Sequence, residues 1–199
     1  MDKVFVIRNG AADGLPSRIV LEAGEKLKLT LVVMPGVSCE RSVRVELNGP
    51  GAEADIAGLC LCEGKDRVSL ELNLEHNSGG CTSRQLFKSL ADDAAKVSFS
   101  GLVKVAAGAQ KTKALQESHA LLLSPDASVQ SQPQLEIYAD DVECSHGATT
   151  GYLNPDEQFY LRSRGVPEAE ARRLQLISFI SPVLQRLPED LAAELSEAL

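Results

Sequence analysis

The sequence predicts a mainly β chain that ends in α-helices, and two patterns lead to this prediction. Up to Gly151, short runs alternate apolar with polar residues and are interrupted by Gly, Asn, Asp and Pro. A period of two is typical of strands with one buried face. From Asn154 onward, apolar residues recur at the spacing of a helix. We therefore expect a β body over residues 1–151 and a helical segment over residues 152–199.

Alternation marks the strands of the β body, and no convincing amphipathic helix interrupts them. Only the stretch Ser83–Ala95 is ambiguous between strand and helix. The clearest strand candidates are Leu27–Val33, Val43–Leu47, Val68–Leu74 and Leu135–Ala139.

A weak internal repeat indicates how these strands are arranged. Four segments begin with Gly and a small residue, at Gly51, Gly80, Gly108 and Gly147, which lie 29, 28 and 39 residues apart. A period of this size predicts a β-solenoid, in which each coil adds one layer to a stacked core. The long last interval then needs an insertion, which we place at residues 124–133. An antiparallel sandwich, which also spaces its strands evenly, is an equally good interpretation of the repeat alone.

Capping residues and prolines mark three helices after residue 154. Asn154 and Pro155 form an N-cap and first helical position, and Gly165 is a C-terminal stop. Pro167 and Pro188 open the second and third helices. The second should kink or split near Ser181, because Pro182 follows it. Apolar residues line one face of each of these two helices, namely Leu174, Ile177, Ile180, Leu184 and Leu187, then Leu191 and Leu195.

Charge and composition exclude several classes of protein. With 20 Lys and Arg against 28 Asp and Glu, the chain has a formal charge of −8 and lacks the basic surface needed to bind nucleic acid or anionic membranes. No apolar run reaches the roughly 18 residues of a membrane span, and we expect no signal peptide. The five cysteines, an odd number without a secretory signal, predict reduced thiols in the cytoplasm.

The densest group of reactive side chains lies at residues 140–147. Within it, Cys144 and His146 are two residues apart, so on a strand they share one face. A thiolate and an imidazole form a plausible ligand pair for iron or zinc. Two ligands do not complete a site, so the others would come from elsewhere in the chain or from a partner. The alternative is structural, with Cys144 packed inside and His146 at the sheet edge.

Other chemistry is poorly supported, and we predict no catalytic residue and no resident cofactor. Asp140 and Asp141 are adjacent and would face opposite sides of a strand, which excludes a glycosidase pair. No phosphate-binding loop and no dinucleotide fingerprint occurs. We expect His76 and His119 to be ordinary hydrogen-bonded histidines. We also expect Cys39, Cys60 and Cys62 to be buried in the core.

Several motifs in order resemble one family. Residues 134–151, Gln-Leu-Glu-Ile-Tyr-Ala-Asp-Asp-Val-Glu-Cys-Ser-His-Gly-Ala-Thr-Thr-Gly, resemble the signature of the SufB/SufD family of the SUF iron–sulfur cluster assembly system. Residues 157–165 resemble the helical tail of that family, and residues 108–112 and 121–124 resemble its preceding coils. The Cys-Ser-His form of the signature is similar to SufD. The chain is shorter than typical members of this family.

The resemblance implies a fold, partners and a role. It implies a right-handed parallel β-helix followed by helices, in a non-catalytic scaffold subunit. The last strands would pair with a SufB-type subunit or with a second copy of the chain, and a SufC-type ATPase would dock on the helical tail. An iron–sulfur cluster or iron would be held transiently at the subunit junction, with His146 at the junction and Cys144 beside it.

Two alternatives to this role come from other classes of protein. The first is a structural dimeric β-helix that binds the ATPase but holds no metal. The second, a β-helical carbohydrate-active enzyme, is poorly supported because the chain lacks paired carboxylates and aromatic platforms. For the pairing with a partner, we expect an edge strand within residues 134–143 to lie at a two-fold interface.

Overall fold

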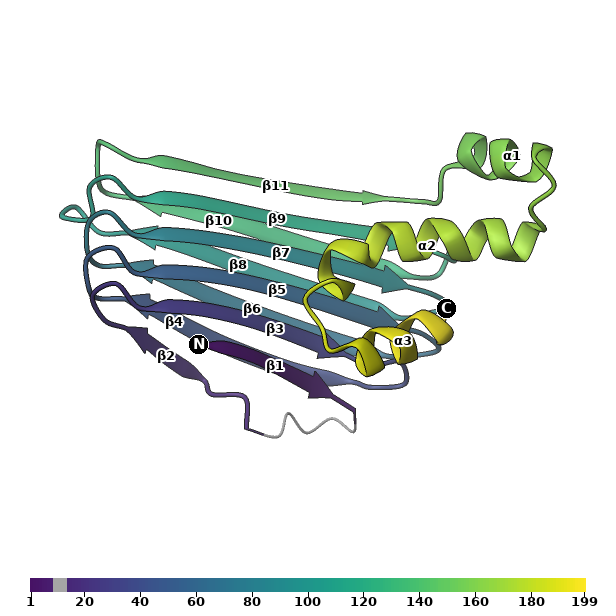
Figure 1. Ribbon diagram of the computed structural model, residues 1–199, viewed down its shortest axis with the longest axis horizontal. Coiled ribbons are helices and arrows are strands. Elements are labelled where there is room, and N and C mark those ends of the chain that lie inside the picture. Colours follow the sequence, from purple (N-terminus) through teal and green to yellow (C-terminus); the bar gives the residue numbers. More distant parts are fainter. Residues whose placement is uncertain (9–13) are drawn as a thin grey trace.

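The computed structural model of the protein describes residues 1–8 and 14–199. Within these residues the chain forms eleven strands and then three helices, so the change from strands to helices lies where the sequence predicts it (Figure 1). The strands are β1 (Asp2–Ile7), β2 (Arg18–Leu21), β3 (Lys26–Val33), β4 (Cys39–Leu47), β5 (Glu53–Cys62), β6 (Arg67–His76), β7 (Thr82–Ala91), β8 (Lys96–Val105), β9 (Lys113–Leu122), β10 (Ser128–Ile137) and β11 (Glu143–Gly151). The helices are α1 (Pro155–Ser163), α2 (Glu168–Leu184) and α3 (Glu189–Glu197).

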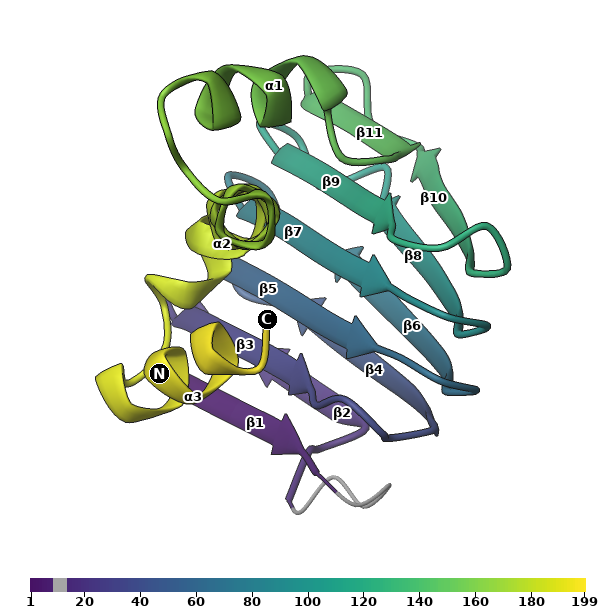
Figure 2. The ribbon, with the colours of Figure 1, turned by 90° about the vertical axis from the view of Figure 1, so that its right-hand side faces the viewer.

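The strands alternate between two sheets. The odd-numbered strands form a six-stranded sheet in the order β1-β3-β5-β7-β9-β11, and the even-numbered strands form a five-stranded sheet from β2 to β10. Neighbouring strands in each sheet run parallel. Each coil of the chain therefore adds one strand to each sheet, and the two sheets face one another (Figure 2). The predicted β-solenoid is confirmed, with about five coils, and the antiparallel sandwich is excluded.

The strand register confirms the repeat in part. Val68 pairs with Val97 and Glu53 with Thr82, which are intervals of 29 residues. Gly51 and Gly80 precede β5 and β7 at equivalent turn positions, with φ of 70° and 69°. Other conserved markers of the turn fail further along the chain. The equivalent position before β9 is Lys111, with φ of 63°, rather than Gly108.

The last coil corrects three expectations about residues 124–151. The predicted insertion is largely the strand β10, which accommodates Pro133 because β10 is an edge strand. The strand expected up to residue 142 ends at Ile137, and the chain then turns before β11. Gly147 does not mark a turn, because it lies inside β11 opposite Glu117.

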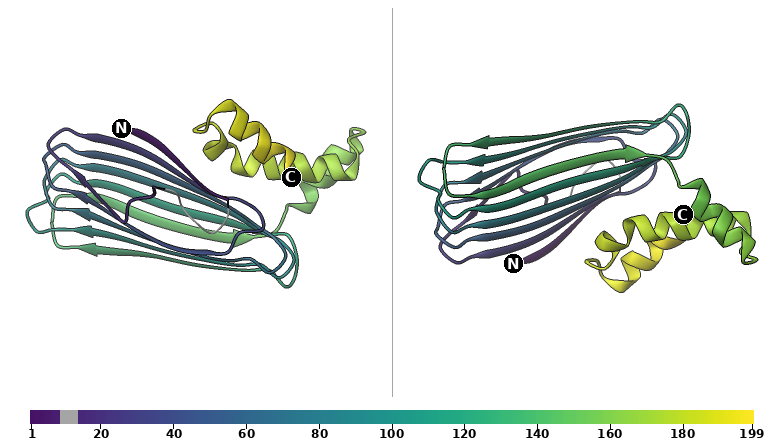
Figure 3. Two further views of the ribbon diagram at one scale, coloured as in Figure 1. Left: turned by 90° about the horizontal axis from the view of Figure 1, so that it is seen from below. Right: turned by 90° about the horizontal axis from the view of Figure 1, so that it is seen from above.

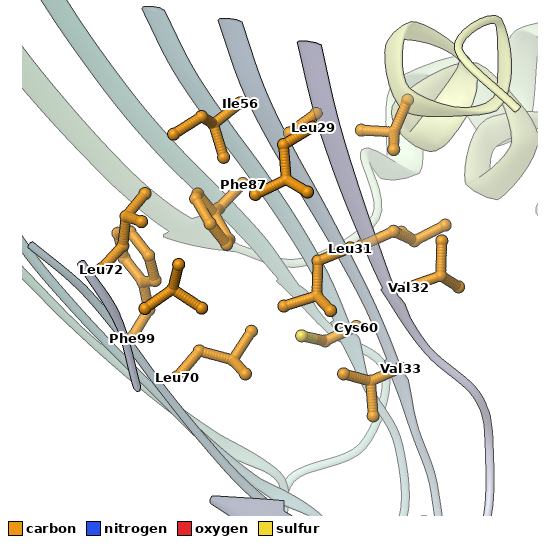
Figure 4. Packing of buried hydrophobic residues seen from close by; sticks show 14 of the residues in the cluster. Leu29, Leu31, Val32, Val33, Ile56, Cys60, Leu70, Leu72, Phe87 and Phe99 are labelled. Carbon is orange, nitrogen blue, oxygen red and sulfur yellow. The ribbon is translucent and has the colours of Figure 1, made fainter. Parts of the chain in front are cut away.

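Apolar side chains from both sheets fill the space between them. Figure 4 shows Leu29, Ile56 and Phe87 from one sheet facing Leu70, Leu72 and Phe99 from the other. The rings of Phe87 and Phe99 stack with their centroids 4.1 Å apart. Few aromatic residues are needed because each coil adds a thin layer of aliphatic side chains.

The helices lie along the outer face of the six-stranded sheet (Figures 2 and 3). Apolar side chains of α2, Ile180 and Val183 among them, are buried there. Arg186, just after α2, joins the helical segment to the sheet. Its guanidinium donates to Asp55 Oδ1 at 2.7 Å, to the Asp55 carbonyl at 2.9 Å and to Thr30 Oγ1 at 3.2 Å.

The helix termini follow the predicted capping residues, but Pro182 does not split α2. Asn154 caps α1 by accepting from the backbone N–H of Asp156 at 2.9 Å, and Gly165 follows α1 with φ of 88°. The helix α2 continues through Pro182 to Leu184. Proline cannot donate to the carbonyl of Ser178, and the Ser181 hydroxyl donates to that oxygen instead at 3.0 Å. No helix among the described residues is long and apolar enough to cross a membrane.

Candidate functional site

The last coil of the solenoid leaves its inner row of side chains open to solvent. The strand β11 pairs with β9 and ends its sheet, and β10 ends the other sheet in the same coil (Figure 1). In β9, the residues that point between the sheets are Ala114, Gln116, Ser118 and Ala120, and all four are buried. Their register partners in β11 are Cys144, His146, Ala148 and Thr150. Cys144 and His146 therefore share the inner row of β11, as the sequence predicts.

Cys144 is half-buried on this row, opposite Ala114. Burial raises the pKa of its thiol, and a hydrogen bond with the Ala114 backbone partly opposes that shift. The residue also lines an open depression of about 480 Å³ at the starts of β7, β9 and β11. The thiol can therefore be reached from solvent, although it is not an activated thiolate.

His146 is exposed, two residues further along the same strand. Its position at the open end of the solenoid matches the accessibility that a transient metal ligand needs. The expectation that the chain turns directly after His146 is wrong, because β11 continues to Gly151. His146 is thus held on a paired strand rather than on a flexible turn.

The acidic residues around this pair are neutralised by lysines. Lys111 forms an ion pair with Asp141, and Lys113 contacts Glu143 at 3.0 Å. Among the residues that the structure describes, no group of three or more His, Cys, Asp or Glu side chains is arranged to hold a metal ion. Cys144 and His146 are chemically suited to iron, but a complete ligand set needs groups from outside this chain.

The other histidines occupy structural positions, as expected. His76 is buried, and its Nε2 lies 2.9 Å from the Ser83 hydroxyl. Burial lowers the pKa of His76 to about 4. His119 Nδ1 lies 2.8 Å from Thr149 Oγ1, and burial together with the charge of Lys88 lowers its pKa.

The remaining cysteines are also consistent with structural roles. Cys60 and Cys62 are buried, and burial raises the pKa of both thiols, to about 12 for Cys62. Cys81 is buried as well, and its thiol donates to the Gly49 carbonyl at 3.3 Å. Cys39 is half-buried rather than fully buried, so the core prediction holds for it only in part.

The sequence analysis missed a pair of buried glutamines below the open coil. Gln85 and Gln116 are fully buried on the inner rows of β7 and β9, and Gln116 Nε2 donates to Gln85 Oε1 at 2.8 Å. His146 is the next residue in the same register. The signal in the sequence is a glutamine at a position where strand alternation requires an apolar residue, repeated 31 residues later.

Exposed aromatic side chains gather near this end of the molecule. Four of the eight aromatic residues are more than half exposed: Tyr138 and Tyr152 on either side of β11, and Phe159 and Tyr160 on α1. A groove of about 500 Å³ between α1 and α2 lies beside Tyr160 and Leu174. An exposed set of large apolar side chains is typical of a protein interaction surface.

Comparison with known proteins identifies the family. Residues 10–179 match the family described as SUF system FeS cluster assembly, SufBD core domain. The chain is 38% identical over 167 residues to the iron–sulfur cluster assembly protein SufD of Escherichia coli, which covers 84% of this chain and 37% of that protein. It is 32% identical over 184 residues to SufD of Bacillus subtilis, covering 92% of this chain and 40% of that protein.

A plant protein extends the comparison. The chain is 36% identical over 170 residues to the chloroplastic protein ABCI7 of Arabidopsis thaliana, covering 84% of this chain and 35% of that protein. The chain thus spans between a third and two fifths of the length of these relatives. Because the family match includes the solenoid and most of the helical segment, the chain belongs to the SufBD core family of the SUF iron–sulfur cluster assembly system.

Proposed function

We propose that this chain is a non-catalytic, SufD-like scaffold subunit in iron–sulfur cluster assembly. The observation that carries the proposal is the open last coil of a SufBD core domain, with Cys144 and His146 on its inner row. The cluster or its iron is a transient cargo in this role, and the chain contributes an incomplete ligand set. Incomplete ligation favours release, because the cargo loses ligands when the junction opens.

The partner at the junction is a SufB-type subunit or a second copy of this chain. Support comes from β10 and β11, which end their sheets with one side of each backbone unpaired. A second solenoid that pairs with these edges would satisfy the free backbone donors and acceptors. The same pairing would cover His146 and bring the missing ligands to it.

A SufC-type ATPase binds the helical segment in this proposal. The exposed Phe159 and Tyr160 of α1 and the groove between α1 and α2 support this placement. Aromatic side chains are common anchors of protein interfaces, because they bury a large area with little loss of conformational freedom.

A second role is favoured by one specific observation. Within the described part of the chain, no group of metal-ligating side chains is complete. The chain could therefore act as a structural β-helix that pairs with its partner and binds the ATPase without holding metal. Loss of cluster from a complex that carries His146→Ala would exclude this second role.

Co-purification tests the proposed partners. The tagged chain should bring down a SufC-type ATPase and either a SufB-type subunit or an untagged copy of itself from its own cells. A His146→Ala variant is the matched control, because His146 is exposed and its loss removes no core volume. Recovery of the chain alone, as a monomer in both forms, would contradict the scaffold role.

A further inference from the structure

The buried glutamine pair ends in an acceptor that has no partner. Gln116 Nε2 donates to Gln85 Oε1 in the coil below, whereas Gln116 Oε1 is buried and makes no hydrogen bond. The oxygen and nitrogen of an amide lie on opposite sides of its carbon. With its nitrogen bonded to Gln85, the oxygen of Gln116 faces the next coil.

The residue above Gln116 on that coil is His146. Their Cα atoms are register partners in β9 and β11, and neighbouring strands in a sheet lie about 4.8 Å apart. Within the inner row, His146 is thus the side chain nearest in register to the unpaired oxygen. A buried carbonyl oxygen without a donor costs about 1–3 kcal/mol, so a bond from an imidazole N–H would relieve that cost.

The space around Gln116 is shaped to hold this amide. Across the interior, β8 has Gly101, and a Cβ atom at that position would lie 2.3 Å from Gln116 Nε2. Any larger residue at 101 would displace the amide from its present position. The absence of a side chain in β8 therefore keeps the glutamine in line with the rows above and below it.

A histidine that binds a metal through one ring nitrogen usually donates its other N–H to a fixed acceptor, which sets the tautomer and the ring orientation. Nδ1 is close to the backbone of β11 and can reach the adjacent coil. Nε2 is at the far end of the ring and points beyond the solenoid. An acceptor below Nδ1 would thus leave the Nε2 lone pair free for a ligand at the junction.

We propose that Gln116 is a positioning residue for His146. Its Oε1 accepts a hydrogen bond from the His146 Nδ1–H when the ring turns onto the coil, and the bond from Gln116 to Gln85 holds the amide in place. This inference rests on the proposed function, because it takes His146 as a ligand. The bond itself, however, is a property of this chain without metal or partner.

Nitrogen-15 NMR of the three histidines tests the proposal directly, because long-range couplings report which ring nitrogen carries the proton. At pH 8 we expect His146 of the wild type to favour the Nδ1–H tautomer, and Gln116→Leu to lose that preference. Gln116→Glu keeps an acceptor oxygen and should restore it. Ser118→Ala is the matched control, because Ser118 is buried on the same row beneath Ala148. An equal tautomer ratio in the wild type and Gln116→Leu would overturn the proposal.

Zinc titration gives a second readout and separates the two proposals. The metal should bind the wild-type chain about tenfold more tightly than Gln116→Leu, and Ser118→Ala should bind as the wild type does. Equal affinity in wild type and Gln116→Leu would count against positioning. If the wild type and His146→Ala bind zinc equally, His146 is not a ligand and the proposed function fails, while the tautomer comparison still decides the role of Gln116.

Discussion

The buried His76 makes the stability of this fold depend on pH in a way that one substitution can isolate. His76 is fully buried, and burial lowers its pKa from 6.5 to about 4. Because the folded pKa lies below the unfolded pKa, the unfolded chain takes up the proton first. The contribution to stability is complete above pH 6.5 and falls as the pH drops toward 4.

The size of the effect follows from the shift in pKa. Each pKa unit corresponds to 1.36 kcal/mol, so a change from 6.5 to about 4 is equivalent to roughly 3 kcal/mol below pH 4. At pH 5 the loss relative to neutral pH is about 2 kcal/mol. His76→Gln removes the titration and keeps a side-chain amide that can bond to the Ser83 hydroxyl.

The assay is urea denaturation of both proteins at pH 7.5 and pH 5.0. Acidic groups and His119 titrate in both proteins, so the difference between the two pH-dependent losses isolates His76. We expect the wild type to lose about 2 kcal/mol more than His76→Gln between the two pH values. Equal losses in the two proteins would show that His76 is not held neutral by burial, and the reasoning would be refuted.

Three further predictions concern the interior and the helical segment. Arg186→Met should lower the free energy of unfolding by about 2–4 kcal/mol in thermal denaturation, because it removes the hydrogen bonds to Asp55; an unchanged melting temperature would contradict this role. Gly101→Ala should cost about 1–3 kcal/mol through its clash with the buried amide, whereas Gly108→Ala, where a Cβ meets nothing within 4 Å, should leave stability unchanged; equal effects would argue against the clash. Phe159→Ser should weaken capture of the ATPase in a pull-down without lowering the melting temperature, since the ring is 74% exposed, and undiminished capture would remove α1 from the interface.

Much of the fold could be predicted because each coil repeats the same local pattern. Alternation located most of the strands, and the interval between Val68 and Val97 is the true register of β6 and β8. The N-cap Asn154 likewise marks the start of α1. These features depend on residues close together in the sequence, where the physical constraint is local.

The errors have non-local causes. Lys111 takes a left-handed turn position that glycine fills in other coils, so the repeat loses its marker there. Pro133 indicates a loop, but an edge strand can accept a proline. The consequence of Pro182 depends on the Ser181 hydroxyl, which replaces the lost backbone donor.

The candidate site could be predicted only in part, because its chemistry is divided between chains. The spacing of Cys144 and His146 indicates a shared strand face, and β11 has it. The open coil above them and the glutamines below them depend on how the coils stack. The remaining ligands would lie on a partner, which the sequence of this chain does not contain.

Cluster content of the assembled complex tests the central claim most directly. The complex formed with the wild-type chain would be loaded with iron and sulfide under anaerobic conditions, and its iron, sulfide and visible absorption compared with those of His146→Ala and Cys144→Ser complexes. The account predicts that His146→Ala assembles normally and melts at the wild-type temperature but holds substantially less cluster. Full cluster content in both variants, at wild-type stability, would contradict it and leave this chain a structural subunit.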